Sequence, residues 1–305
     1  MGGLGAVWAK ACMPVCNRPL VHHHLDLLLQ MGVREVVIVV GYRGHEVMTT
    51  ASGHPSVVDG ELRLTRIEQL EPRGIADALL CARPAIQDHM VVVLGDTYFV
   101  PEDLLKPIAM LSTPAGELGA VLTIRREVDP KQICRECTVR FDDAGHLLRI
   151  QEKPDTPWND LKPCGMYFFG PRIWDAINQT APSALRDEVE ITDAIQTLVD
   201  LGIPVGRAPT VSRDVNINVP RDLLSANLLE LSRRGAAVDI HSTADVDPNA
   251  RLDQVVVGPN ATVGPGVALS RALILPDTVI QSPVTHPTDV AIYGALFQQP
   301  PARRV

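Results

Sequence analysis

The stretch PLVHHHLDLLLQMGVREVVIVVGY (residues 19–42) decides the fold class, because it predicts a helix followed at once by a strand. Apolar residues recur at helical spacing as far as Gly32, a typical helix stop. The β-branched run that follows (34–42) is continuous and does not alternate with polar residues. Such a run predicts a strand covered on both faces.

The same order of elements recurs along the first half of the chain. Strands are predicted at 62–69, 90–96 and 118–126, with helices at 74–86 and 101–111 between them. Alternation of this kind predicts an α/β fold with a mostly parallel sheet and helices on both faces. Ligands bind such sheets at the carboxyl ends of the strands, which directs attention to Gln69, Asp96 and the segments after them.

Shorter strands are predicted in residues 138–170, where the segment DDAGH (142–146) predicts a glycine-centred hairpin. We interpret this region as an inserted β-rich lobe. Helices return at 171–180 and 191–202, and Thr192 is the predicted N-cap of the second.

After residue 234 the composition changes to small, polar, glycine and proline residues. Four aliphatic residues fall six positions apart there: Val257, Val263, Leu269 and Leu275. A six-residue period predicts a short β-helix around a triangular core, and the alternative is an irregular Pro/Gly-rich tail. We therefore expect two domains, residues 1–234 and 235–305.

Composition restricts the class of function. The net charge of −8 and the absence of a basic arm argue against general nucleic-acid binding. No apolar run reaches the roughly 18 residues of a membrane span, and the N-terminus lacks a secretory pattern, so we expect a soluble, cytoplasmic protein. Six scattered cysteines favour reduced thiols, and Cys134-x-x-Cys137 is only half of a zinc site.

Four segments bring polar chemistry to the expected binding edge. Taken singly each is weak, because an acid after a strand is commonly a helix cap and Glu-Lys-Pro is usually a solvated turn. Together, in this order and spacing, the four segments are a strong indication of a binding site. The segments are AKACMPVCNRPL with Lys10, EQLEPRGIADAL with Gln69 and Gly74, VLGDTYF with Asp96, and RIQEKP with Glu152 and Lys153.

This set resembles the sugar-1-phosphate nucleotidyltransferases, also called NDP-sugar pyrophosphorylases. The resemblance runs from residue 9 to about 230, includes the segments VEITDAIQTLVDLG and VPRDLLSANLL, and continues into the β-helix tail that many members carry. It is strongest to the long glucose-1-phosphate thymidylyltransferase type, in which VGIYFF stands where this chain has CGMYFF. It implies a Rossmann-like nucleotide-diphosphosugar transferase domain followed by a short left-handed β-helix.

The resemblance implies a role for each matching residue. Asp96 binds Mg²⁺, and the second metal ligand aligns with Asn216, although Asp214 is close enough to substitute for this weaker neutral ligand. Lys10 neutralises the triphosphate. The other implied roles are Lys153 on the sugar phosphate, Glu152 on the sugar hydroxyls, Gly165 for close approach of the hexose, and Gln69 with the backbone at Gly74 on the base edge.

One part of the family pattern does not match. Members begin with a strand and a Gly-x-Gly-Thr-Arg loop that wraps the triphosphate, about a dozen residues before the lysine that matches Lys10. Here the glycines of GGLG (2–5) lie much nearer to that lysine, with no strand, Thr or Arg. We therefore expect this chain to lack the first strand and the phosphate loop, and to bind nucleotide poorly.

The expected reaction joins a nucleoside triphosphate to a sugar-1-phosphate and releases pyrophosphate, as a glucose-1-phosphate thymidylyl- or uridylyltransferase or a mannose-1-phosphate guanylyltransferase. The alternative is a weak or inactive paralogue that binds a nucleotide sugar or regulates a partner. A third reading, acyl transfer through the β-helix, lacks a well-placed catalytic His. We expect a homo-oligomer and no membrane partner; base and sugar stay open.

Overall fold

The computed structural model describes residues 4–86, 88–112, 118–183, 187–281 and 291–294. The chain forms two compact units. We call residues 24–94 and 99–214 the sheet unit, and residues 1–23, 95–98 and 215–305 the solenoid unit. Gly2 and Gly3 of the GGLG segment lie outside the described residues. None of the helices that are described is long and apolar enough to span a bilayer.

A four-stranded sheet with the order β11-β7-β10-β5 forms the centre of the sheet unit. β11 runs parallel to β7, whereas β10 runs antiparallel to both of its neighbours. The sheet is thus less parallel than predicted. The chain runs from β7 to β10 through a short helix (Pro130–Arg135) and a β-hairpin, and β10 then lies alongside β7 in the opposite direction. The strands are β5 (Met90–Val93), β7 (Ala120–Arg126), β10 (Leu161–Phe169) and β11 (Val205–Ala208).

Three helices and the hairpin share one core with this sheet. Ala120, Leu122 and Ile124 alternate along β7 and all join that core, as expected for one face of a strand. Thr192 is not the predicted N-cap, because the helix already begins at Ile191 after Glu190. The elements are α5 (Ile75–Ala82), α8 (Ile173–Gln179), α9 (Ile191–Asp200), β8 (Cys137–Phe141) and β9 (Leu147–Glu152).

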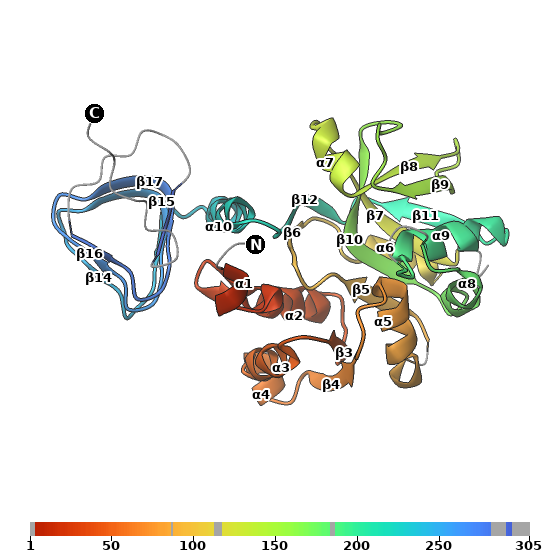
Figure 1. The fold of residues 1–305 in the computed structure, drawn as a ribbon, viewed down its shortest axis with the longest axis horizontal. Coiled ribbons are helices and arrows are strands. Elements are labelled where there is room, and N and C mark those ends of the chain that lie inside the picture. Colours follow the sequence, from red (N-terminus) through yellow and green to blue (C-terminus); the bar gives the residue numbers. More distant parts are fainter. Residues whose placement is uncertain (1–3, 87, 113–117, 184–186, 282–290, 295–305) are drawn as a thin grey trace. The chain divides into compact units, whose positions relative to one another are not determined.

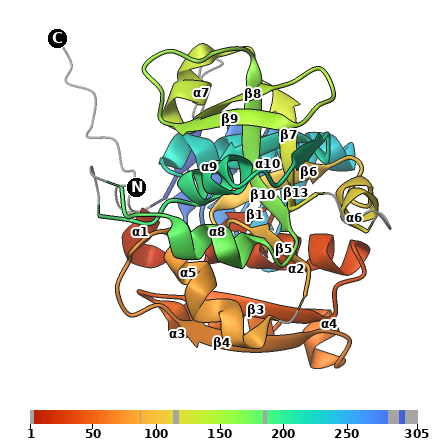
Figure 2. The same ribbon diagram turned by 90° about the vertical axis from the view of Figure 1, so that its right-hand side faces the viewer.

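The helix and strand of residues 19–42 form as predicted, as α2 (Leu20–Gln30) and β3 (Glu35–Val40). β3 pairs in parallel with β4 (Arg63–Glu68), and Figure 2 shows this pair beside α3 (Gly44–Ser52) and α4 (Pro55–Val58). β3 is less covered than its continuous apolar run suggested. Only Val40 is buried, because β4 is its one strand partner among the described residues.

The helix predicted over 101–111 is shorter than expected. Residues 97–101 are extended as β6 (Thr97–Pro101), and the helix α6 covers only Lys106–Leu111. Pro107 lies in its first turn, where a proline ring suits the start of a helix. The remaining elements of this half are η2 (Arg83–Ala85), α7 (Pro130–Arg135) and β12 (Val211–Asn216).

Parallel strands stack into coils in the solenoid unit (Figure 1). Arg251 pairs with Ala268, and Asp245 pairs with Thr262, so these coils advance 17 residues, close to three six-residue repeats, whereas β17 and β19 pair 19 residues apart. The four aliphatic residues that carry the six-residue spacing are all buried. The strands are β13 (Val238–Ile240), β15 (Arg251–Val257), β17 (Ala268–Ile274) and β19 (Ala291–Tyr293) in one sheet, and β14 (Asp245–Val246), β16 (Thr262–Val263) and β18 (Val279–Ile280) in another.

The rest of the solenoid unit consists of short N-terminal elements and one long helix. β1 and β2 form a tight hairpin, with Cys16 and Asn17 in the left-handed conformation that a two-residue turn requires. The elements are α1 (Leu4–Val7), η1 (Lys10–Cys12), β1 (Pro14–Val15), β2 (Arg18–Pro19) and α10 (Pro220–Arg234).

Candidate active site

A chain of polar side chains in the solenoid unit joins three of the predicted site positions. The Lys10 ammonium donates to Asp96 Oδ2 at 2.9 Å and to Asn218 Oδ1 at 2.8 Å. The Asn218 amide in turn donates to Asn216 Oδ1 at 2.9 Å. The order Asp96–Lys10–Asn218–Asn216 brings the predicted triphosphate-binding lysine and both predicted metal ligands into one network.

Asn218 is the member of this network that the sequence argument missed. It is only two residues from the aligned ligand position, but a second asparagine has no distinctive sequence pattern. Its backbone N–H donates to Asp222 Oδ2 at 2.9 Å, and the N–H of Val219 donates to the same oxygen at 2.8 Å. Asp222 lies in the first turn of α10, so the start of this helix holds the loop that carries Asn218.

Two further residues of α10 hold the other segments of the network. Asn227, fully buried, accepts from Cys16 N at 2.7 Å and donates to Pro14 O at 3.1 Å, which fastens the hairpin that follows Lys10. Glu230 accepts a hydrogen bond from the hydroxyl of Tyr98, two residues after Asp96. One helix therefore anchors all three segments.

Glu230 is fully buried yet ionised. Burial opposes ionisation, but hydrogen bonds from Arg233, Tyr98 and Arg234 outweigh it and lower the pKa of this carboxyl to about 2. Arg233 Nε and Arg234 Nε each donate to it at 2.6 Å. A paired charge of this kind fixes the position of Tyr98, and with it the direction of the segment leaving Asp96.

The residues around Asp96 fit a Mg²⁺ ion held mainly by phosphate. Among the described residues no group of three or more His, Cys, Asp and Glu could hold a metal. Asp96 Oδ2 accepts from Lys10, whereas Oδ1 has no hydrogen-bond partner within the described parts of the chain. Mg²⁺ is often held by one or two carboxylates plus substrate phosphates. Here Asp96 Oδ1 would supply the single carboxylate ligand, and Asn216 would add a neutral amide oxygen.

Asp214, the alternative metal ligand, is occupied by two cations. Its carboxylate is 1% exposed, accepts from Lys162 Nζ at 2.6 Å and also pairs with Arg125 Nε. Burial alone would raise the pKa of Asp214, but Lys162 and Arg125 outweigh it and hold the pKa below its usual value. A carboxylate with both oxygens bonded to buried cations is a poor metal ligand, so Asn216 is the better candidate.

Gln69 and Gly74 lie together at the carboxyl end of β4, as their positions predicted. Gln69 Nε2 donates to Gly74 O at 3.1 Å and to Asp77 Oδ2 at 2.7 Å. Gly74 has a φ of +98°, and a Cβ there would lie 2.5 Å from Val189 O. The glycine is therefore required for the chain path at the start of α5, whatever its part in binding.

Glu152 is the last residue of β9, and Lys153 follows it at the edge of the β8–β9 hairpin. Lys153 takes a positive φ of 41°, which is costly for a non-glycine residue, and its N–H donates to Glu136 O at 2.6 Å. Its side chain is 44% exposed and therefore accessible to an anion. Gly165 lies within β10, where a Cβ would come 2.8 Å from Leu94 Cδ1, so packing also requires this glycine.

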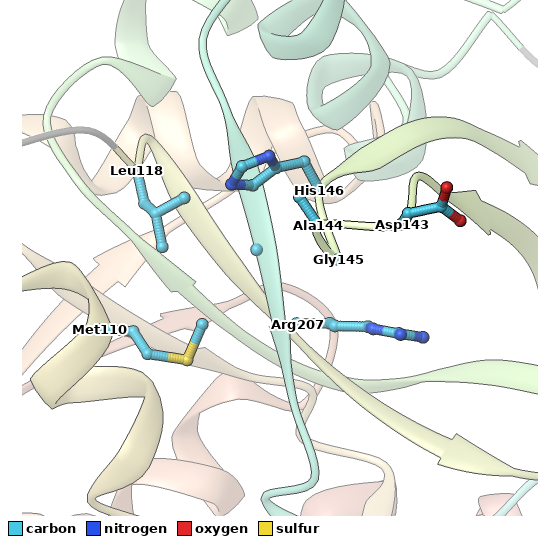
Figure 3. A pocket seen from close by; sticks show the side chains of 8 residues that line it. Met110, Leu118, Asp143, Ala144, Gly145, His146 and Arg207 are labelled. Atoms are coloured by element: carbon cyan, nitrogen blue, oxygen red, sulfur yellow. The ribbon is translucent and has the colours of Figure 1, made fainter.

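A separate cavity of about 260 Å³ in the sheet unit contains none of the predicted site residues (Figure 3). Met110 and Leu118 form its apolar side, and the turn at residues 143–146 forms another. Arg207, which borders it, packs over the Phe141 ring with 4.7 Å between guanidinium and ring centroid. That contact gives Arg207 a structural role.

Comparisons with known proteins show the family of this chain. The family model described as "Nucleotidyl transferase" matches residues 3–211. The chain is 32% identical over 236 residues to the low-salt glycan biosynthesis nucleotidyltransferase Agl11 of Haloferax volcanii, covering 75% of this chain and 64% of that protein. It is 30% identical to a glucose-1-phosphate thymidylyltransferase of Streptomyces griseus, covering 90% and 80%.

The fold has a counterpart among solved structures. A UDP-glucose pyrophosphorylase complexed with UDP-glucose superposes with a TM-score of 0.62 at 18% identity, covering 74% of this chain and 91% of that one. The α/β architecture is thus shared with a nucleotide-sugar enzyme. On the extent of the family match and the identity to these relatives, the chain belongs to the nucleotidyl transferase family.

Proposed function

We propose that this protein transfers a nucleotidyl group from a nucleoside triphosphate to a sugar-1-phosphate, giving an NDP-sugar and pyrophosphate. The observation that carries the proposal is the Lys10 ammonium held between Asp96 Oδ2 and Asn218 Oδ1. A fixed cation beside a carboxylate whose Oδ1 has no partner in the described parts of the chain suits a substrate that carries several phosphates.

One bond forms and one bond breaks in the reaction. An oxygen of the sugar phosphate attacks the α-phosphorus in line, and the bond from that phosphorus to the oxygen bridging to the β-phosphorus breaks. The leaving pyrophosphate takes the bond electrons. Because the nucleophile is already an anion, no protein base is needed, and the protein contributes positioning and charge neutralisation.

Different residues position and neutralise each of the two substrates. Lys10 neutralises the triphosphate and the charge that develops on the leaving pyrophosphate. Lys153 binds the sugar phosphate, with its exposed ammonium 3.9 Å from Glu152 Oε1. Glu152 accepts hydrogen bonds from sugar hydroxyls, and Gly165 lets the hexose approach the backbone.

Asp96 and Asn216 are the residues that would hold Mg²⁺. When bound, the ion would screen the charge on the phosphate oxygens during transfer. Lys10 is already seated on one oxygen of Asp96, so the lysine and an ion can use the same carboxylate through different oxygens.

A uridine or thymidine nucleotide with glucose-1-phosphate is the pair that the relatives favour. The Streptomyces griseus relative is named for glucose-1-phosphate thymidylyl transfer, and an AglF relative of Haloferax volcanii is named a UTP–glucose-1-phosphate uridylyltransferase. Mannose-1-phosphate with a guanosine nucleotide is the alternative pair.

A second candidate function is nucleotide-sugar binding with little or no turnover. The observation that favours it is Asn216, a neutral side chain whose Oδ1 already accepts from Asn218. With Asp96 as the one carboxylate of the network, metal affinity is reduced compared with a pair of carboxylates.

Pyrophosphate release distinguishes the two functions. UTP, dTTP, ATP and GTP are each tested with glucose-, galactose-, mannose- and N-acetylglucosamine-1-phosphate. Lys10→Ala should lower release at least a hundredfold, whereas Lys131→Ala, at an exposed position, should leave it unchanged. Nucleotide binding without release for any pair would favour the second function; no nucleotide binding would refute both.

We also propose that the solenoid winds left-handed and that the protein is a cytoplasmic homo-oligomer. The six-residue spacing supports the first proposal. The exposed apolar side chains of Ile240 and Val279 on the solenoid support the second. Sedimentation velocity should give a mass of at least twice the monomer, and a monomer at micromolar concentration would contradict this.

A further inference from the structure

The backbone of Lys153 has a conformation that a lysine disfavours. Its φ of 41° lies in the left-handed region, which residues with a Cβ rarely adopt. The next residue is Pro154, and a following proline normally favours an extended backbone. Such a conformation costs free energy and persists only where the surrounding structure imposes it. The contacts that impose it here are therefore of interest for the function of this lysine.

A backbone hydrogen bond ties Lys153 to Glu136. The carbonyl oxygen of Glu136 accepts from Lys153 N at 2.6 Å. Glu136 directly precedes β8, and Lys153 directly follows β9. The adjoining strand residues, Cys137 and Glu152, are opposite each other in the hairpin. The bond thus closes the hairpin one position beyond its last strand pair and fixes the direction in which the chain leaves β9.

The side chain of Glu136 is itself anchored to the central sheet. Its Oε2 lies 3.0 Å from Lys162 Nζ, and the Lys162 side chain is only 3% exposed. Lys162 belongs to β10, which lies between β7 and β5 in the sheet. A carboxylate bonded to a buried ammonium has little freedom to move. The ion pair therefore fastens the residue that holds Lys153 to the sheet.

Stability does not account for this carboxylate. Burial raises the pKa of Glu136 to about 7, and the attraction of Lys162 offsets that only in part. Lys162 already has a closer partner in Asp214 Oδ2, at 2.6 Å. A buried carboxylate that is not needed to neutralise its neighbour contributes little to the stability of the fold. A role in placing Lys153 gives a reason for its presence.

We propose that Glu136 is a positioning residue for sugar-phosphate binding, which fixes the backbone of Lys153 so that its ammonium meets the phosphate. This inference rests on the proposed function, in which Lys153 binds the sugar phosphate. The Lys153 side chain is 44% exposed, and its ammonium is 3.9 Å from Glu152 Oε1, beyond hydrogen-bond distance. With the side chain held so loosely, the direction of the backbone decides which positions the ammonium can reach.

Calorimetric binding tests this without requiring turnover. The probes are glucose-1-phosphate and mannose-1-phosphate, with UTP and dTTP as nucleotides. Glu136→Ala leaves Lys162 paired with Asp214, so the chain should fold. It should weaken sugar-phosphate binding about tenfold and change nucleotide binding less than about twofold, because more freedom at Lys153 must be lost when the phosphate binds. Glu136→Gln keeps an oxygen that can accept from Lys162 and should restore binding to within about threefold of the wild type.

Three controls separate positioning from general damage. In a Lys153→Ala background, Glu136→Ala should weaken sugar-phosphate binding no further, because Glu136 acts through Lys153. The Lys153 amide should exchange its hydrogen faster in Glu136→Ala than in the wild type, since this amide donates to the Glu136 carbonyl. Glu61→Ala, at an exposed position before β4, should leave both affinities unchanged.

The outcomes that overturn the inference are distinct from those that overturn the function. Full sugar-phosphate affinity in Glu136→Ala, where Lys153→Ala loses affinity, refutes the role of Glu136 and leaves nucleotidyl transfer standing. Equal losses for sugar phosphate and nucleotide in Glu136→Ala, or additive losses in the double variant, refute it as well. Full affinity in Lys153→Ala, or a wild type that binds neither sugar phosphate, refutes the proposed role of Lys153 and this inference with it.

Discussion

Replacing Lys162 by Met should destabilise the protein by about 3–5 kcal/mol, the range for removing one partner of a buried ion pair. The Lys162 side chain is 3% exposed and its ammonium lies 2.6 Å from Asp214 Oδ2 and 3.0 Å from Glu136 Oε2. Methionine fills most of the same volume. The loss would therefore come from charge. Among the described residues, Asp214 would keep Arg125 as its one cationic partner, and Glu136 would have no ion-pair partner left.

The cost of this substitution should depend on pH. Burial raises the pKa of Glu136 to about 7, against an ordinary value of 4.5, and Lys162 only partly offsets it. The folded state thus holds a proton that the unfolded chain has released, and this group lowers stability as pH rises from about 4.5 to 7. Without Lys162 the charged form is still less favourable. The difference between variant and wild type should be larger at pH 8 than at pH 5.

Urea unfolding at both pH values measures the effect. Lys131→Met, at an exposed position of α7, is the matched control and should change the free energy of unfolding by less than about 0.5 kcal/mol. A loss below about 1 kcal/mol for Lys162→Met, or a loss that is the same at pH 5 and pH 8, would refute the view of Lys162 as a buried counter-ion.

Three further predictions concern the proposed site and its support. Asp96→Asn should lower Mg²⁺-dependent pyrophosphate release about a thousandfold without changing the melting temperature, and retention of more than a tenth of the activity would contradict the metal assignment. Lys153→Ala should weaken calorimetric binding of sugar phosphate but not of nucleotide; an equal loss for both would contradict its role. Glu230→Gln should cost about 3 kcal/mol at pH 7, as the lowering of its pKa from 4.5 to about 2 indicates. The wild-type contribution is present above about pH 4.5 and is lost as pH falls toward 2, so thermal melts of the two proteins should converge at low pH.

Local patterns in the sequence predicted most of the regular elements. The helix and strand of residues 19–42 and the hairpin around Gly145 depend on spacing within a few residues, and they formed as expected. Strand direction was harder, because it depends on how the chain returns to the sheet. β10 runs antiparallel to β7 after a connection through α7 and the β8–β9 hairpin, and only the three-dimensional structure shows this path.

Polar partners from distant segments could not be predicted in the same way. Lys162 and Asp214 are 52 positions apart, and nothing in the local sequence of either residue marks it as buried. The same holds for Tyr98 and Glu230, 132 positions apart. A charged residue in a strand or helix is most often exposed, so a sequence argument places it at the surface unless the partner is known.

The charge balance of the Asp96 network bears on what it can bind. Its two asparagines are neutral, so Lys10 and Asp96 are its only formal charges and their sum is zero. With a carboxylate at 216 the sum would be −1, and a triphosphate would approach against net repulsion until a metal ion entered. The neutral amide removes that repulsion at the expense of metal affinity. In the proposed function Lys10 would therefore bear a larger share of the neutralisation, and its two hydrogen-bond partners hold it in place for that role.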